Sequence, residues 1–324
     1  MTRINLFRTG RDNLPSKRSN DPTLVFLGTG GADCTPRVGC LCEICTEARQ
    51  KGGRYSRSGP SVFFTGAELL FDTPEDIAHS LEREDIHHVS HLAYSHWHPD
   101  HTMGRRVLEQ LNLNLRKRTK TITDVWLPSW VRDDFRKMLG LEDHFQFFEK
   151  MGIVKIHEFA EGEAIRLGSA TVKAFRMTQP GLASYLVQQG TKRMVLALDE
   201  IKDWNPRSEL MEPDVLVLET GWFEHDKLGE QIIPTGHWIR ESEASFEETL
   251  ELVQKINPRA AIATHIEELN GHSYADYLEL EKKYREYRLR FAYDGLRISI
   301  SEKYSDVEPE PRDKNKIGSE NEEP

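Results

Sequence analysis

The chain lacks any apolar run long enough to cross a membrane. Of its 324 residues, 38% are hydrophobic and 30% are charged, and no stretch approaches the ~18 consecutive apolar residues of a transmembrane helix. The first twenty residues, 1–20, are polar and of mixed charge, without the apolar centre of a signal peptide. We therefore expect a soluble, cytoplasmic, globular protein.

An excess of positive charge is also missing. Lys and Arg number 43 against 53 Asp and Glu, so the formal net charge is −10. This balance argues against general nucleic-acid binding, which needs a basic surface. Residues 305–324 are rich in acidic and other polar side chains, and we expect a disordered acidic tail there rather than a partner-binding segment. One folded domain over 21–304, after a polar extension over 1–20, fits the length.

Cysteine is scarce, but three of the four cysteines lie close together. Cys40, Cys42 and Cys45 form a CxCxxC cluster, and Cys34 precedes it. In a cytoplasmic protein this spacing favours a metal over a disulfide. Three thiolates need a fourth ligand to close a tetrahedral zinc site, which then has no open position for chemistry. We predict a structural zinc that holds an irregular loop, with free or redox-active thiols as the alternative.

The most informative motif is HWHPDH at residues 96–101, which follows a short apolar segment, 92–95, predicted to be a buried strand. Its three imidazoles and one carboxylate suit zinc, iron or manganese. The i, i+2 spacing puts His96 and His98 on the same side of an extended chain. Asp100 and His101 follow in the turn and can face a second ion. The motif predicts a metal site rather than a solvated loop.

This motif and three other segments resemble the metallo-β-lactamase superfamily. The resemblance runs from about residue 23 to residue 300 and includes LLFD at 69–72, VLALD at 195–199 and AIATH at 261–265. It implies an α/β fold, the αββα sandwich of two packed mixed β-sheets flanked by helices. It also implies that Asp72 orients the site, that Asp199 bridges two ions, and that His265 is the last histidine ligand.

Within the superfamily, the N-terminal half is most similar to the cyclic-phosphate phosphodiesterases of phosphonate breakdown. The matching residues are LGTGG at 27–31, Pro36, and GCLCEIC at 39–45. Protein B of pyrroloquinoline quinone synthesis is a relative with the same cysteine spacing. In the phosphodiesterases a histidine three residues after the strand-end histidine completes the zinc site, whereas Glu268 stands there in this chain. His272 or Cys34 could complete it instead.

The catalytic ligand set departs from the family at one position. Relatives supply a third histidine to the first ion, and Gln179 is the best match to that place. Its neutral carbonyl oxygen is a weak ligand for zinc. We therefore expect the first site to bind more weakly or to take a different ion, or the chain to use a single ion. Glu200 could compensate if its side chain turned back into the site.

The resemblance then gives each ion its ligands. The first ion would be held by His96, His98 and Asp199, with Gln179 as a fourth contact. The second would be held by Asp100, His101, Asp199 and His265. We expect zinc or manganese in these catalytic sites, with iron as a further option, and zinc at the cysteines.

These ligands predict a metal-dependent hydrolase, a phosphodiesterase acting on a small cyclic or nucleotide-like phosphodiester. Two cations that share a hydroxide make it a nucleophile at neutral pH, and they offset charge at phosphorus. Asp100 belongs to this catalytic centre, and Asp72 would orient a histidine ligand or instead cap the segment from Pro74. His237 is the candidate proton donor to the leaving group, although it could equally begin a helix or pack beside Trp238.

Two other functions remain open at this stage. Two histidines and one carboxylate also form the arrangement used by iron-dependent oxygenases, as in the quinone-synthesis relative. A metal-binding protein without turnover is the other alternative. Proteins of this fold are often dimers, so a homodimer is one assembly that the sequence leaves open.

Apolar periodicity predicts alternating strands and helices, an order that suits two packed sheets flanked by helices. Strands are expected at 23–27, 62–64, 68–71, 92–95, 125–127, 153–159, 170–177, 185–187, 193–198, 215–218 and 260–264. Helices are expected at 105–113, at 130–139, from a capping box at 245–248 to Asn257, and at 274–287.

Overall fold

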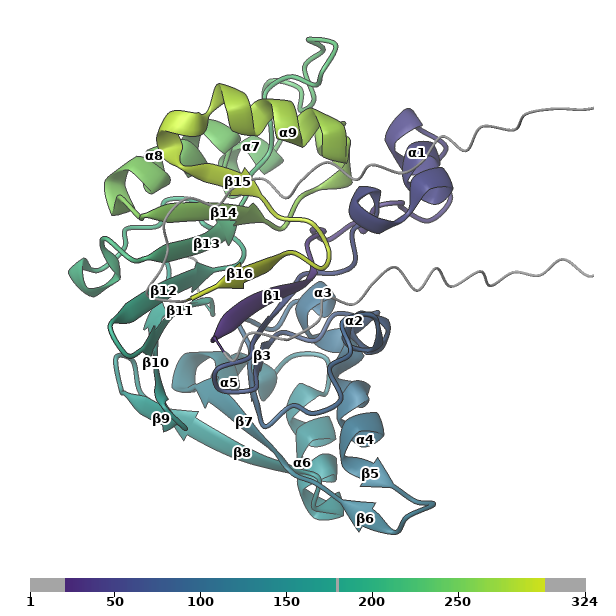
Figure 1. Ribbon diagram of the computed structural model, residues 1–324, viewed down its shortest axis with the longest axis vertical. Coiled ribbons are helices and arrows are strands. Elements are labelled where there is room, and N and C mark those ends of the chain that lie inside the picture. The colour runs from purple at the N-terminus through teal and green to yellow at the C-terminus, as the bar shows by residue number, and fades with distance from the viewer. Residues whose placement is uncertain (1–20, 179–180, 301–324) are drawn as a thin grey trace, which may run out of the picture.

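Two seven-stranded sheets lie against each other, with helices on their outer sides (Figure 1). The computed structural model describes residues 21–178 and 181–300. The expected N-terminal extension, the expected acidic tail and Gln179 therefore lie outside the described residues. The predicted fold class, an αββα sandwich of two mixed sheets, is confirmed.

The first sheet combines antiparallel and parallel strands. β1 and β2 pair antiparallel, as do β2 and β3, whereas β3, β4, β7 and β8 run parallel. In spatial order its strands are β16 (Arg297–Ser299), β1 (Thr23–Gly28), β2 (Ser61–Phe64), β3 (Leu69–Phe71), β4 (His91–Ala93), β7 (Thr123–Pro128) and β8 (Val154–Phe159). The predicted hairpin of β2 and β3 is present, with Val62 opposite Phe71.

The second sheet has the same mixture. β9 to β12 are antiparallel, and β12 to β15 are parallel. In spatial order its strands are β15 (Leu289–Phe291), β14 (Ala260–Thr264), β13 (Val215–Glu219), β12 (Lys192–Ala197), β11 (Ala183–Gln189), β10 (Ala170–Arg176) and β9 (Ile165–Leu167). The small sheet of β5 (Leu113–Asn114) and β6 (Thr119–Lys120) projects from the first half.

Helices cover the outer face of each sheet. Beside the first sheet lie α2 (Ile77–Arg83), α3 (Pro99–Thr102), α4 (Val107–Asn112), α5 (Ser129–Phe135) and α6 (Leu141–Met151). Beside the second lie α7 (Ile239–Ser242), α8 (Phe246–Ile256) and α9 (Tyr274–Lys283), while α1 (Glu43–Lys51) stands apart in the cysteine segment. Short 3₁₀ turns are η1 (Gly53–Tyr55), η2 (Met103–Arg106), η3 (Ser208–Leu210), η4 (Glu268–Asn270) and η5 (Arg285–Tyr287).

Strand β13 shows how the sequence builds the core. All of its side chains are buried, as expected for a central parallel strand. Val215 and Val217 join the apolar cluster between the two sheets, whereas Leu216 and Leu218 face the cluster beneath the outer helices. The period of two therefore lets one strand fill both layers.

Helix boundaries were predicted less well than strands. The capping box at Ser245 is present, and Asn257 ends α8 in the left-handed conformation, as expected. The helix predicted at 130–139 ends early, because Leu139 and Gly140 both adopt left-handed backbone. The helix predicted at 105–113 begins as the turn η2, and Leu113 leaves it to pair with Lys120.

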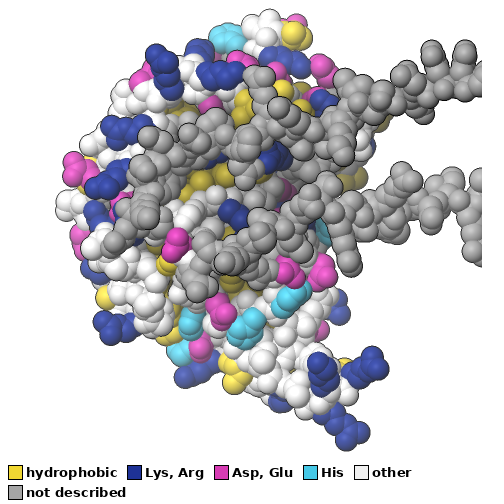
Figure 2. Space-filling view, in the orientation of Figure 1, with side chains coloured by type: hydrophobic (Ala, Val, Ile, Leu, Met, Phe, Trp, Pro, Cys, Tyr) yellow, Lys and Arg dark blue, Asp and Glu magenta, His cyan; other side chains and the backbone are white. Residues whose placement is uncertain are grey.

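The length of the helices and the distribution of charge on one face of the molecule bear on function. None of the helices in the described part of the chain is long and apolar enough to cross a bilayer. On the face in Figure 2, basic side chains are spread among acidic and apolar ones. The basic group at the lower end of that view belongs to the β5–β6 turn, which carries the exposed residues Arg116, Lys117 and Arg118.

Candidate metal centre

The residues of the candidate site stand just after the ends of strands from both sheets. Asp72 follows β3, and His96 comes three residues after β4. Asp199 follows β12 after one intervening residue, and His265 follows β14 directly. Carboxyl ends of parallel strands meet at one edge, where α/β proteins commonly bind ligands. The fold therefore gathers segments that are nearly 200 residues apart in the sequence.

Two groups of potential metal ligands share one carboxylate, Asp199. In each group the ligand atoms all lie within 4.8 Å of one another. The first group is His96, His98, Asp199 and Glu200, and the second is Asp100, His101, Asp199 and His265. The structure therefore brings together the motif residues, Asp199 and His265, and it adds Glu200 to the first group.

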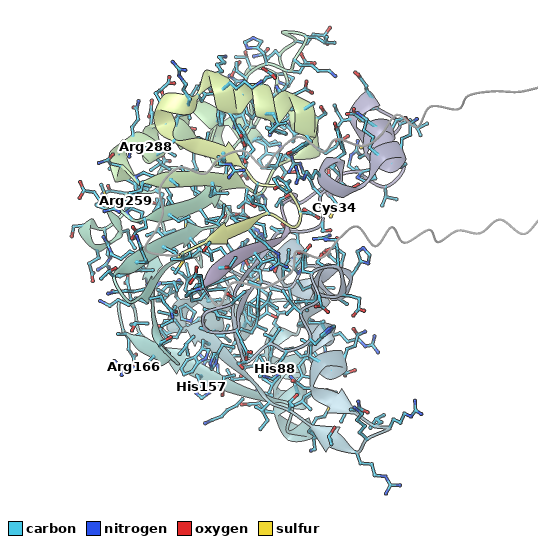
Figure 3. The ribbon with its side chains drawn as sticks, in the orientation of Figure 1. Cys34, His88, His157, Arg166, Arg259 and Arg288 are labelled. Atoms are coloured by element: carbon cyan, nitrogen blue, oxygen red, sulfur yellow. The ribbon has the colours of Figure 1, made fainter. Side chains whose placement is uncertain are left out.

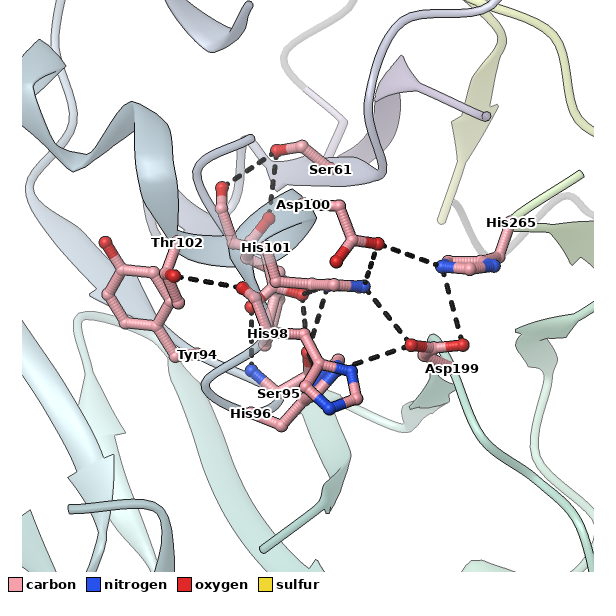
Figure 4. A network of polar contacts seen from close by, with 12 residues as sticks. Ser61, Tyr94, Ser95, His96, His98, Asp100, His101, Thr102, Asp199 and His265 are labelled. Carbon is pink, nitrogen blue, oxygen red and sulfur yellow. Dashed lines mark hydrogen bonds and ion pairs between the residues drawn. The ribbon is translucent and has the colours of Figure 1, made fainter. Parts of the chain in front are cut away.

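The Asp199 carboxylate lies between imidazoles of both groups (Figure 4). Its Oδ2 is 3.3 Å from Nε2 of His96 and 3.4 Å from Nε2 of His101. Its Oδ1 is 3.4 Å from Nε2 of His265. Asp100 lies across from it, with Oδ2 3.3 Å from Nε2 of His101 and 3.6 Å from Nε2 of His265. Asp199 is thus positioned to bridge the two groups.

Three ring nitrogens at this site are buried and lack hydrogen bonds. Nε2 of His96, His101 and His265 have no hydrogen-bond partner among the described residues, although each lies near a carboxylate. Leaving a buried polar atom unpaired costs roughly 1–3 kcal/mol. Imidazole nitrogens and carboxylate oxygens that converge in this way fit divalent cations such as zinc, manganese or iron. The donor set therefore suits the metal centre that the sequence predicted.

Asp72 contacts the site through His101. It is fully buried, and its Oδ2 is 2.9 Å from Nδ1 of His101. It also accepts hydrogen bonds from the backbone N–H and the hydroxyl of Ser95, at 2.7 and 2.6 Å. A carboxylate on one ring nitrogen fixes the tautomer and the direction of the other. The capping alternative fails, because Asp76 stands at the N-cap of α2.

Neighbouring charges strongly perturb the histidines of the second group. Burial lowers the pKa of His265, but the charge of Asp199, with Asp100 and Glu267, outweighs it and raises the pKa to about 10. Burial also lowers the pKa of His101, but the charges of Asp100 and Asp72 outweigh this effect. They raise the pKa of His101 well above its usual value. These imidazoles hold a proton at neutral pH unless another cation replaces it.

The first group behaves differently. Burial and the neighbouring His96 lower the pKa of His98 to about 4. Burial and then His101 lower the pKa of His96. Burial, with the charges of Asp199 and Glu243, raises the pKa of Glu200 to about 7. At neutral pH these imidazoles are unprotonated, the form in which histidine binds a metal.

Three residues of the site adopt left-handed backbone without being glycine. Asp72 has φ 63°, Glu200 has φ 47° and His265 has φ 52°. Side chains other than Gly, Asn and Asp adopt this region rarely, and such strain is concentrated at functional sites. At each of these positions the chain turns sharply after a strand, so that the side chain faces the site.

The three clustered cysteines surround one carboxylate oxygen. Oε1 of Glu268 lies 3.2 Å from Sγ of Cys40, 3.1 Å from Sγ of Cys42 and 3.1 Å from Sγ of Cys45. These four residues form a third group of potential metal ligands. Glu268 begins η4, three residues after His265, so this group joins the cysteine loop to the segment that carries a ligand of the main site.

Two other candidates for the fourth ligand do not reach the thiols. His272 points away, because Gly271 turns in the left-handed conformation; its Nδ1 contacts the carbonyl of Asn270 and its ring lies beside Phe223. Cys34 is outside the group as well, and burial followed by the charge of Asp76 raises its pKa to about 12. The expectation that either completes the cysteine site is therefore corrected in favour of Glu268.

The structure does not bring His237 to the ligand groups. It immediately precedes Trp238 at the start of α7, its ring stacks on that tryptophan, and its Nδ1 accepts a hydrogen bond from the Ile239 backbone. It lines a separate open cavity of about 380 Å³ together with Asp226 and Leu269. His237 therefore stands before a helix and packs beside Trp238, as the alternatives describe, and its role as proton donor stays a prediction.

Three buried or half-buried carboxylates near the site were not predicted. Glu219 ends β13, Glu267 follows His265 by two residues, and Glu243 follows α7. Burial and then Asp199 raise the pKa of Glu219 to about 8 and raise that of Glu243. The end of the apolar strand could have indicated Glu219, because β13 runs parallel to β12, the strand that precedes Asp199. His88 precedes β4 and His157 lies on β8, both in the half of the molecule that holds the first sheet (Figure 3).

Two packed mixed sheets with histidines and carboxylates at their strand ends define the class of the protein: an αββα protein with a candidate dinuclear metal centre. The model of the β-lactamase superfamily domain matches residues 68–266, which is more than half of the chain. The chain belongs to the metallo-β-lactamase superfamily.

Solved structures share this fold. A diphosphatase of the PhnP family is 20% identical, with a TM-score of 0.63 over 86% of this chain and 96% of that one. Zinc-bound PqqB from Methylobacterium extorquens is 16% identical, with a TM-score of 0.60 over 86% and 100%. The short form of human tRNase Z is also 16% identical, with a TM-score of 0.56 over 86% and 99%. A search of curated proteins finds no match to this sequence.

Proposed function

We propose that this protein is a metal-dependent hydrolase that cleaves a small phosphodiester, cyclic or nucleotide-like. The observation that carries the proposal is the position of Asp199, whose carboxylate lies near His96 of the first ligand group and near His101 and His265 of the second. Asp199 would help to hold a cation in each group, and two cations so held would polarise a phosphate ester. Two of the similar structures are a diphosphatase and a tRNase, which supports phosphate-ester chemistry.

The residues of the chain would hold and orient the reaction centre. His96, His98 and Asp199 would hold one ion, and Asp100, His101, Asp199 and His265 the other. When bound, divalent cations supply Lewis-acid polarisation of the phosphate and a nucleophile derived from water at neutral pH. Asp72 keeps the His101 ring aimed at Asp199 and Asp100, because it occupies the opposite ring nitrogen.

The cysteine group would have a structural role. Cys40, Cys42, Cys45 and Glu268 can supply four ligands to one zinc ion, which leaves no open position for a substrate. The group fixes η4 against the cysteine loop, and the same segment carries His265. We propose zinc here because three thiolates favour a soft or borderline ion over manganese.

The test is hydrolysis of bis-p-nitrophenyl phosphate by protein depleted of metal and then loaded with manganese or zinc. We expect turnover that requires metal and that falls at least about 100-fold in the variant Asp199→Asn, because the bridge is lost. A fully loaded wild-type protein that leaves this ester and cyclic nucleotides intact would contradict the proposal.

A second function is favoured by the donor types within each group. Two imidazoles with carboxylates are also the ligands of iron enzymes that activate oxygen. Oxygen consumption by anaerobically prepared, iron-loaded protein, without phosphodiester cleavage, would select this function over hydrolysis. Silence in both assays, together with stabilisation by added metal, would indicate a metal-binding protein without turnover.

A further inference from the structure

Glu200 is the residue of the first ligand group that neither a motif nor a strand end explains. It stands directly after Asp199, and in an extended chain two successive side chains point in opposite directions. Here Glu200 instead adopts left-handed backbone, with φ 47°. Its N–H donates a hydrogen bond of 2.9 Å to Oδ1 of Asp199, which closes a tight turn. The turn lets both carboxylates face the same histidines.

The Glu200 side chain reaches His98. Its Oε1 is 3.3 Å from Nδ1 of His98, and the carboxylate is mostly shielded from solvent. In the described part of the chain, the ion pairs of Asp100, Asp199 and Glu200 are all made with histidines rather than with Lys or Arg. No fixed positive side chain therefore occupies the place between these carboxylates.

An independent observation points to a cation at the same place. The Nε2 atom of His96 is buried and has no hydrogen-bond partner among the described residues. It belongs to the same group, in which the ligand atoms of His96, His98, Asp199 and Glu200 all lie within 4.8 Å of one another. A ring nitrogen that binds a cation needs no hydrogen-bond partner, so a buried nitrogen without one is expected at a metal site.

We propose that Glu200 is a ligand of the first ion and that it gives this site a preference for manganese or iron over zinc. The inference rests on the proposed dinuclear centre. With Glu200 included, each ion has two imidazoles and two carboxylates, and Asp199 is common to both. Carboxylate oxygens are harder ligands than imidazole nitrogens. A second carboxylate in place of a third imidazole therefore favours manganese over zinc at this site.

The experiment is a manganese titration of chelator-treated protein followed by electron paramagnetic resonance. Free manganese gives a signal that measures binding, and two manganese ions bridged by Asp199 give the spectrum of a coupled pair. We expect the wild type to bind a coupled pair. Glu200→Gln should retain one uncoupled ion and bind the other about 100-fold more weakly, because loss of an outer partner alone costs about 10–100-fold.

Glu243→Gln is the matched control. Glu243 is a half-buried carboxylate whose pKa responds to Asp199, but it lies outside both ligand groups. It should retain the coupled pair. Competition by zinc completes the test: the ratio of manganese to zinc affinity at the weaker site should fall in Glu200→Gln and stay unchanged in Glu243→Gln.

The outcomes separate the two proposals. If the wild type binds no pair of ions, the dinuclear centre itself fails. If the wild type binds the pair and Glu200→Gln binds it equally well, only the assignment of Glu200 is overturned. An equal loss in both variants would also overturn it, since Glu200 would then act through its charge alone. Thermal unfolding of each variant confirms that it is folded before the titration.

Discussion

Asp199 and the imidazoles around it illustrate what single residues contribute to this site. The carboxylate is buried, and His265 and His101 outweigh the effect of burial so that its pKa stays well below the usual value. It therefore remains ionised in the range where a hydrolase works. Its negative charge in turn keeps protons on His265 and His101. A divalent cation can replace those protons without a change in the fold.

Asp72 offers a test of how a residue behind the ligands acts. The substitution Asp72→Asn keeps the size of the side chain but removes the charged acceptor next to Nδ1 of His101. We expect metal affinity to fall by about 10–100-fold. Isothermal titration with manganese measures this directly.

The control is Asp76→Asn, which changes a nearby carboxylate in the same way. Asp76 accepts from the Gly59 N–H and contacts no metal ligand group. It should leave affinity unchanged. Wild-type affinity in the Asp72→Asn protein would show that the His101 ring is oriented without it.

Metal binding should release protons at neutral pH. The raised pKa values of His265, about 10, and of His101 mean that both rings are protonated in chelated protein at pH 7. Ligation requires the neutral ring, so uptake of the second ion expels protons and its affinity should fall as the pH is lowered. Calorimetric titrations in buffers of different ionisation enthalpy measure the number of protons released; a heat that is independent of the buffer would contradict this.

The raised pKa of His265 also determines how the stability of the metal-free protein changes with pH. The pKa of His265 in the fold lies above its ordinary value of 6.5, so protonation favours the folded state. This contribution is fully present below pH of about 6.5 and is lost as the pH rises through about 10. Burial of the ring opposes it, and the charges of Asp199 and Asp100 prevail.

At the scale of elements, the cysteine loop and helix α1 form one unit. Cys42 is the N-cap of α1, and its side chain accepts from the backbone N–H of Cys45. The helix was not predicted, because its apolar residues are few and the cysteines obscure its start. Glu268 is the first residue of η4, which lies far from the cysteines in the sequence. The loop is therefore held by residues that are more than 220 positions apart.

Replacing one thiol tests the structural zinc. Cys42→Ser keeps a good N-cap, since serine caps helices well, but it removes a soft ligand. We expect one zinc fewer per chain by elemental analysis and a melting temperature lower by roughly 5 °C or more. Cys34→Ser, outside the group, should change neither quantity. Full zinc content in the Cys42→Ser protein would argue for free thiols instead.

At the scale of the whole molecule, the candidate centre joins the two sheets. His96, His98, Asp100 and His101 follow a strand of the first sheet, whereas Asp199 and His265 follow strands of the second. The contacts between the two sets include those of His96 and His101 with Asp199 and that of Asp100 with His265. Bound ions should therefore stabilise the packing of one sheet on the other.

Removal of metal should lower the stability of the entire domain. Ions that bind only the folded state stabilise it by about 2.7 kcal/mol when their free concentration is about 100 times Kd. For a domain of this size that corresponds to a melting temperature lower by several degrees. Thermal unfolding before and after chelation and after reloading with manganese measures the change. An unchanged melting temperature despite demonstrated binding would mean that the ions bind the unfolded chain as tightly as the folded domain.

The sequence by itself determined the fold class and most of the candidate site. Local patterns were sufficient for the strands, because alternation and apolar runs report burial directly, and the HxHxDH motif is contiguous. Asp199 and His265 were implied by the resemblance of VLALD at 195–199 and AIATH at 261–265 to segments of the superfamily. Strand boundaries were close to those observed, whereas the helices at 105–113 and 130–139 were placed too long, since single left-handed residues such as Leu139 leave no clear signal.

Only the tertiary structure decided which distant side chains meet. It placed Glu268 rather than His272 or Cys34 at the thiols, and it placed His237 beside Trp238, just before α7. It also showed Glu200 turned toward His98. Each of these outcomes depends on a backbone turn of one residue, at Gly271, at the start of α7 or at Glu200 itself. Such a turn is set by packing between segments far apart in the chain, which no local pattern records.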